Sequence, residues 1–161
     1  MKTILIPTDF SQRSLDCIPS LCSQYDTQKV SFVFVHMFKL SDSIGDLLML
    51  SRRSREFENI SDDFYNKCTT YKAQLPNIEV IKIEFFYGST ISMFRNFLEN
   101  HEVDCVLNPA DCSCNKINKS SIDPAILIEK SALPVISINR TQLEKLAREL
   151  RITPELQLAQ A

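Results

Sequence analysis

Residues 30–36 form a nearly continuous run of β-branched and aromatic side chains, Val-Ser-Phe-Val-Phe-Val-His. A strand with apolar residues on both faces is typical of a parallel sheet that helices cover on both sides. This run therefore predicts a parallel strand that is buried on both faces.

The rest of the chain alternates between strand-like and helix-like segments. Further strands are expected at residues 3–7, 79–86, 103–107 and 134–138. Apolar residues recur every three or four positions in the segments between them, which predicts helices near residues 15–25, 57–75 and 91–98 and after Asp123-Pro124. Such alternation predicts an α/β fold with a mostly parallel sheet, right-handed crossovers and any ligand at the carboxyl ends of the strands.

Two prolines bear on the expected helices. Asp123 is a suitable N-cap with Pro124 at the first helical position. Pro19 falls inside the helix expected at residues 15–25, where we expect it to cause a kink or an early end.

The segment after the last expected strand divides the chain into residues 1–138 and a helical extension, residues 139–161. Residues 141–144 form a capping box, and Leu143, Leu146 and Leu150 form an apolar stripe. Thr153-Pro154 is suited to start a second short helix. The stripe either packs on the domain or meets a partner chain.

Residues 108–121 follow the fourth strand, where this fold would hold a phosphate-binding loop, and they contain no glycine. Phosphate loops need residues without a Cβ so that backbone N–H groups can approach the anion. Pro109 removes one such donor and Asp111 adds a negative charge. The sequence therefore predicts a disabled phosphate site.

Composition excludes several classes of partner. The 161 residues, 44% hydrophobic and 24% charged, suit one globular domain, and the net charge of −2 predicts no general attraction to nucleic acid or anionic membranes. The densest basic cluster, Arg52, Arg53 and Arg55, is followed at once by Glu56 and Glu58, which favours a solvated helix face.

We expect a cytoplasmic protein. The first apolar run is too short for a signal peptide, and no stretch approaches membrane-spanning length. Without a secretion signal, the six cysteines are expected to be reduced thiols, mostly in the core.

Four segments in this order resemble the universal stress protein family. They are residues 2–11 (Lys-Thr-Ile-Leu-Ile-Pro-Thr-Asp-Phe-Ser), residues 35–37 (Val-His-Met), Gly88 with the helix and strand that follow it up to residue 107, and residues 133–135 (Leu-Pro-Val). The resemblance implies a Rossmann-like sheet in the order 3-2-1-4-5, similar to the adenine nucleotide alpha hydrolases. It also implies a homodimer formed through the last strand.

The resemblance also implies where a nucleotide would lie. Pro7, Asp9 and Met37 match positions that surround the adenine and ribose in nucleotide-binding members. The glycines of the family's phosphate motif fall here on Pro109, Cys112 and either Ser121 or Ile122. The candidate nucleotide-site residues are therefore Pro7, Thr8, Asp9, Met37, Asn108, Ser120 and Ser121.

The lost glycines should weaken nucleotide binding. Hydrogen bonds to a charged group contribute roughly 1.5–3 kcal/mol each, so losing two would cost about two to four powers of ten in affinity. Lys116 and Lys119 could compensate, but exposed lysines contribute little, and we interpret them as solvated. No cofactor is expected, and tight ATP binding is disfavoured.

Two groups of side chains could carry chemistry. Asp9 and His36 end neighbouring strands and could form a carboxylate and imidazole pair, although a structural histidine and a helix-capping aspartate are the favoured interpretation. Cys112 and Cys114 could hold a soft metal or form a redox disulfide. A full metal site needs two further ligands, and nothing in the spacing of the other cysteines requires them to supply these ligands, so loop thiols without a role are favoured. No catalytic motif is present, so no enzyme is expected.

Three hypotheses follow. The first is a non-enzymatic stress-response protein with a degenerate nucleotide site that acts through dimerisation or a protein partner. The second is a module that still binds an adenine nucleotide or a smaller metabolite through a rearranged loop. The third is a thiol-based sensor that uses Cys112 and Cys114.

Overall fold

A computed structural model describes residues 2–39, 60–88, 90–117 and 120–138. Five parallel strands form one sheet in the order β3-β2-β1-β4-β5. The strands are β1 (Lys2–Pro7), β2 (Val30–Phe38), β3 (Ile78–Tyr87), β4 (Cys105–Leu107) and β5 (Val135–Ile136). The predicted α/β class and sheet order are confirmed.

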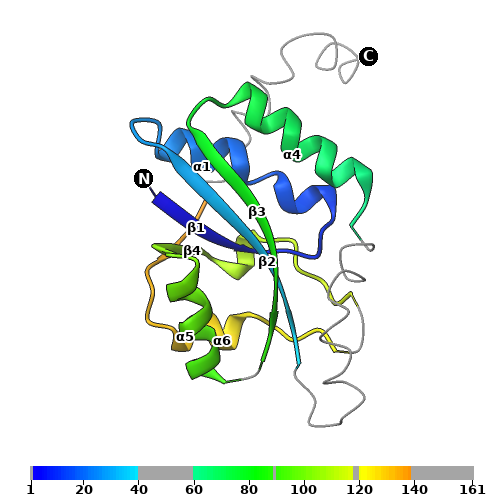
Figure 1. The fold of residues 1–161 in the computed structure, drawn as a ribbon, viewed down its shortest axis with the longest axis vertical. Helices are drawn as coiled ribbons and strands as arrows, with labels where there is room; N and C mark the ends of the chain where they lie inside the picture. The colour runs from blue at the N-terminus through cyan, green and yellow to red at the C-terminus, as the bar shows by residue number, and fades with distance from the viewer. Residues whose placement is uncertain (1, 40–59, 89, 118–119, 139–161) are drawn as a thin grey trace.

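Helices cover both faces of the sheet (Figure 1). One face carries α1 (Ile18–Gln24) and α4 (Asp62–Gln74), and the other carries α5 (Ile91–Asn100) and α6 (Ala125–Lys130). Two 3₁₀ helices, η1 (Gln12–Leu15) and η3 (Pro109–Asp111), follow β1 and β4.

The central strands are apolar on both sides because each side has its own core. Ile4 and Ile6 of β1 pack with Phe64 of α4, whereas Leu5 packs with Phe94 of α5 and with the helices on that face. Neighbouring side chains of a strand point to opposite faces, so a strand inside this sheet needs apolar residues at nearly every position. This accounts for the run in β2, where all nine residues are buried.

Pro19 does not kink a helix, contrary to our expectation. The segment forms η1 first, and α1 begins only at Ile18, so Pro19 lies in its first turn. The N–H groups of a first helical turn have no partner within the helix, and proline, which lacks the N–H, is tolerated there.

Other boundaries differ by a few residues. Ser61 caps α4 by accepting a hydrogen bond from the Phe64 N–H at 3.2 Å, and α4 ends at Gln74. Asp123 accepts from the Ala125 N–H at 2.9 Å, and α6 begins at Ala125, one residue later than expected.

Some expectations concern residues outside the described ranges. They include the basic cluster at Arg52, Arg53 and Arg55 and the helical extension from residue 139 onward. Among the described helices, none combines the length and the hydrophobicity that a membrane crossing requires.

Candidate functional site

The residues that follow β1 begin the site at the carboxyl edge of the sheet. Thr8 is fully buried, and its N–H donates to the Val35 carbonyl at 2.9 Å. Its hydroxyl donates to Ser14 Oγ at 2.7 Å and accepts from the Phe10 N–H at 2.9 Å. The hydroxyl of this predicted site residue is thus used inside the turn.

Phe10 has a left-handed backbone with φ of 62°, a conformation uncommon for a bulky residue. Its ring is buried and packs edge-on against Phe64 and Phe85, with centroids 5.8 and 5.3 Å away. These aromatic contacts offset the backbone cost and hold the turn in which Asp9 lies.

The Asp9 carboxylate is surrounded by donors from its own chain. Oδ1 accepts from the Ser11 N–H at 3.0 Å, and Oδ2 accepts from Ser113 Oγ at 3.2 Å and from both the N–H and the Nδ2 of Asn115 at 3.1 and 2.9 Å. The Asp9 N–H also donates to the Ser113 carbonyl at 3.1 Å. Partial burial alone would raise the pKa of Asp9, but the hydrogen bonds from Ser11 and Asn115 outweigh it and lower the pKa.

The expectation that Asp9 caps a helix is therefore wrong. The N-cap of η1 is Ser11, and the carboxylate fixes the loop that follows η3 instead.

His36 joins three segments at the end of β2. Its ring is 1% exposed, and Nδ1 lies 2.7 Å from the Thr8 carbonyl oxygen. A carbonyl only accepts, so Nδ1 carries the proton in the neutral ring and Nε2 accepts from the Ser121 hydroxyl, also at 2.7 Å. The Ser121 oxygen accepts in turn from the Ile117 N–H at 3.0 Å.

Burial lowers the pKa of His36, although the Thr8 carbonyl and the Asp9 charge act in the opposite direction. The ring bonds to Thr8 and Ser121 in a fixed tautomer. Asp9 and His36, which the sequence suggested as a carboxylate and imidazole pair, thus each bond to other residues: Asp9 to the loop after η3, and His36 to Thr8 and Ser121.

Backbone bonds complete the attachment of the loop to β2. The Ser120 carbonyl accepts from the Lys39 N–H at 2.6 Å, and the Ile122 N–H donates to the Met37 carbonyl at 3.0 Å. The Met37 side chain is 1% exposed and packs in the core under α5 and α6. Of the two predicted residues here, Ser120 contributes through its backbone and Met37 faces away into the core.

Of the remaining predicted residues, Pro7 ends β1 and Asn108 follows β4. Pro7 is buried beside Val35. Asn108 caps η3 by accepting from the Ala110 N–H at 3.0 Å, and its Nδ2 lies 3.4 Å from Ser137 Oγ. The structure thus gathers Thr8, Asp9 and Ser121 around one loop, whereas Asn108 bonds toward η3 and the β5 side.

Sequence reasoning missed the residues that engage Asp9 and Thr8. Ser113 and Asn115 lie more than a hundred positions from Asp9, and Ser14 lies in η1. Their only signal was that short polar side chains, which bond readily to nearby backbone and carboxylates, are frequent in this loop.

Two polar cavities flank the segment from Pro109 to Asn115. One has a volume of about 270 Å³ between Asp16 and Asp111, and the other about 400 Å³ beside Asn115 and Asp123. Arg13 lines both. The site therefore retains room for a small polar molecule at its edge.

The two loop thiols are half-buried and protonated at neutral pH. Burial raises the pKa of Cys114 to about 12 and also raises the pKa of Cys112. The Cys112 thiol lies 3.3 Å from the Asn108 carbonyl oxygen and the Cys114 thiol 3.5 Å from that of Thr8. Within the described ranges, no group of three or more metal-ligating side chains occurs.

Comparison with known proteins finds similarity in structure but not in sequence. No protein-family model matches the chain, and no curated protein matches its sequence. The universal stress protein UspA from Lactobacillus plantarum matches in structure with a TM-score of 0.53 and 15% identity, over 86% of this chain and 97% of that one.

Two further structural matches have lower TM-scores. A universal stress protein family member from Burkholderia pseudomallei has a TM-score of 0.47 and 13% identity, over 85% of this chain and 95% of its own. One from Arabidopsis thaliana, solved with AMP bound, has a TM-score of 0.44 and 10% identity, over 88% and 95%. The match to UspA, together with the parallel sheet in the order 3-2-1-4-5, gives this chain the fold of the universal stress proteins.

Proposed function

We propose that this chain is a non-enzymatic, cytoplasmic protein of the universal stress type with a degenerate nucleotide site. It acts in a stress response by dimerising or by binding a protein partner. One observation carries the proposal: the Asp9 carboxylate and the Ser121 hydroxyl, both candidate ligand contacts, are hydrogen-bonded to the chain's own loop.

Residues 109–112, directly after β4, offer no N–H group to a phosphate. The N–H of Ala110 donates to Asn108 Oδ1, that of Asp111 to the Asn108 carbonyl and that of Cys112 to the Pro109 carbonyl. A phosphate loop needs such N–H groups to point at the anion. Here they are consumed within η3, Pro109 has none, and Asp111 would repel the charge.

Thermal unfolding of the full chain with and without Mg-ATP tests the degenerate site. A ligand at a hundred times its dissociation constant stabilises a fold by about 2.7 kcal/mol, so millimolar ATP would raise the melting temperature of a competent site by several degrees. We expect no shift. A reproducible shift with Mg-ATP, absent with Mg²⁺ alone, contradicts the degenerate site.

The dimer is proposed through β5, which lies at the edge of the described sheet with Val135 47% exposed. Light scattering after size exclusion should give twice the chain mass. Val135→Lys should give a monomer, whereas Tyr65→Lys, a matched charge at an exposed position of α4, should remain dimeric. A monomeric parent protein contradicts this part of the proposal.

A second candidate function is the binding of a small metabolite in the cavity of about 400 Å³ beside Asn115, for which Arg13 supplies a cation. Native mass spectrometry of protein purified from cells should then show a retained ligand that is lost in Arg13→Ala. The exposed Lys116 gives the control variant, Lys116→Ala. A parent protein with no mass beyond that of its polypeptide, or the same excess mass in all three proteins, would contradict a ligand held by Arg13.

A further inference from the structure

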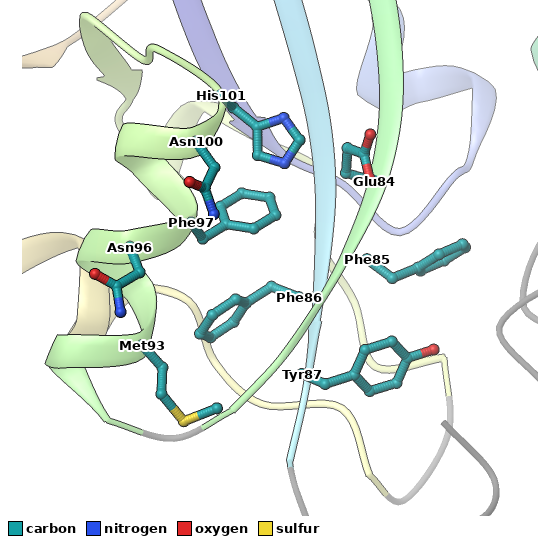
Figure 2. A pocket seen from close by; sticks show the side chains of 9 residues that line it. All are labelled: Glu84, Phe85, Phe86, Tyr87, Met93, Asn96, Phe97, Asn100 and His101. Carbon is teal, nitrogen blue, oxygen red and sulfur yellow. The ribbon is translucent and has the colours of Figure 1, made fainter. Parts of the chain in front are cut away.

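Two cavities of this molecule differ in what their walls expose. A groove with a volume of about 680 Å³ lies between β3 and α5, and in Figure 2 Phe86 of β3 and Phe97 of α5 point toward each other across it. Their rings meet edge to face with centroids 5.4 Å apart, and Phe86 is 4% exposed, so its ring belongs to the core. The cavity of about 400 Å³ beside Asn115 instead exposes charged groups, to which a polar ligand can bind.

Three segments form the wall of the cavity beside Asn115. Arg13 comes from η1, residues 112–115 come from the loop after η3, and Asp123 and Pro124 precede the first residue of α6. Among the described residues that line this cavity, Arg13 is the cation and Asp123 is the carboxylate. The volume is in the range of small-molecule sites.

Arg13 and Asp123 do not pair with each other. In the described part of the chain, the Arg13 guanidinium has no hydrogen bond or ion pair. Asp123 accepts from the Ala125 N–H at 2.9 Å through Oδ1, and its Oδ2 has no partner among the same residues. Two opposite charges therefore share one cavity, and each is exposed to a ligand.

The other carboxylates near Arg13 already have partners. Asp16 and Asp111 line the neighbouring cavity of about 270 Å³. Asp16 Oδ1 lies 2.8 Å from Lys67 Nζ, and Asp111 Oδ2 accepts from the Ile138 N–H at 3.1 Å. Because their charges are partly compensated, these carboxylates compete less with the anionic group of a ligand for Arg13.

The loop adds uncharged polar groups to the same wall. Within the described ranges, the N–H groups of Ser113 and Cys114 donate to no acceptor. Asn115 donates to Asp9 through its N–H and its Nδ2, and its Oδ1 accepts no hydrogen bond from those residues. The cavity thus offers hydrogen-bond donors and an acceptor in addition to its two charges.

We propose that this cavity binds a polar α-amino acid as a zwitterion, with the carboxylate at Arg13 and the ammonium group at Asp123. A planar guanidinium matches a carboxylate with two parallel hydrogen bonds, and a carboxylate accepts from an ammonium ion. A simple anion would be repelled by Asp123, and a simple cation by Arg13. The assignment rests on the metabolite binding proposed above as a second candidate function and adds the chemical class of the ligand.

L-Glutamine is the probe, titrated into the full chain at neutral pH while NMR spectra follow the backbone amide signals of Ser113 and Cys114. We expect saturable shifts of these signals. Glutaramate, which lacks the amine of glutamine, and γ-aminobutyramide, which lacks its carboxylate, should each bind at least about tenfold more weakly, because each loses one contact between charged groups.

Substitutions of the two exposed side chains separate the two charges. Asp123→Asn keeps a carbonyl oxygen for the Ala125 N–H, so it should preserve the start of α6. It should weaken glutamine binding by about tenfold without weakening glutaramate, whereas Arg13→Gln should weaken both. Asp26→Asn and Lys72→Gln make the same changes of charge at exposed positions outside the cavity and should leave every affinity unchanged.

The outcomes distinguish this assignment from the function on which it rests. Equal affinity for glutamine and glutaramate, with both lost in Arg13→Gln, would overturn the amino acid and leave a simple carboxylate as the ligand. No saturable shift with glutamine, or glutamine affinity that neither Asp123→Asn nor Arg13→Gln changes, would also overturn it. The second candidate function fails separately, if protein purified from cells carries no mass beyond that of its polypeptide.

Discussion

Asp9 accepts two hydrogen bonds from Asn115, one from its N–H at 3.1 Å and one from its side-chain amide at 2.9 Å, across 106 positions of sequence. This contact fastens the loop after η3 to the end of β1. The bond from Ser121 to His36 fastens the same loop to the end of β2. The two attachments hold this loop against the carboxyl edge of the sheet.

Asn115→Ala should lower the free energy of unfolding by about 1 kcal/mol. Hydrogen bonds to a carboxylate are stronger than this when buried, but Asn115 is exposed and water replaces part of what is lost. Urea unfolding at neutral pH measures the change, with Lys116→Ala, the next exposed residue, as the control. Equal stability of the two variants would show that the contact contributes nothing.

The stability of the protein should fall as the pH is lowered from 7 to 5, because of His36. The unfolded chain takes up a proton near pH 6.5, whereas burial lowers the pKa of the folded ring, which stays neutral. The contribution is complete above the unfolded pKa and is lost below it, with a slope of up to about 1.4 kcal/mol per pH unit, until the folded pKa is reached. Denaturant unfolding at several pH values measures this slope.

The variant His36→Asn should reduce that slope, whereas His101→Asn, the same substitution at the end of α5, should keep it. A parent protein with constant stability between pH 5 and 7 would contradict the prediction.

Ala132→Gly should stabilise the fold by about 1 kcal/mol. Ala132 follows Ser131, the C-cap of α6, is exposed and has a φ of 63°, a left-handed conformation in which a Cβ is unfavourable. Ala125→Gly, at the start of the same helix, is the control and should be destabilising, since glycine lowers helix propensity. A thermal melt that places both variants below the parent would contradict the expected gain.

Cys112 and Cys114 should react with iodoacetamide at pH 8 at least about a hundredfold more slowly in the folded protein than in urea. The thiolate is the nucleophile, and burial raises the pKa of both thiols. Peptide mapping by mass spectrometry at timed intervals measures the rate for each residue. Fast labelling of either thiol in the folded state would favour the thiol-sensor hypothesis over the absence of a role.

The start of α1 could not be predicted from the spacing of apolar residues alone. The apolar spacing from Leu15 to Tyr25 is compatible with one helix, and only the completed structure shows η1 giving way to α1 at Ile18. A 3₁₀ turn and an α-helix place apolar residues at similar spacings, so periodicity does not separate them over so few residues.

The sequence by itself determined the sheet and the absence of glycine from the segment after β4. Side chains alternate across a strand and recur along a helix, so the doubly apolar run of β2 and the strand and helix repeats specify a parallel α/β fold locally. The absence of glycine between Asn108 and Ser121 is equally a property of the sequence.

Only the tertiary structure decided which groups meet at the carboxyl edge. Asp9 pairs with Ser113 and Asn115, and His36 with Ser121, because β1, β2 and β4 end at the same edge of the sheet and bring segments 85 to 106 positions apart within hydrogen-bond distance. Hydrogen bonds depend on tenths of an ångström and on direction, and no periodicity in the sequence encodes either.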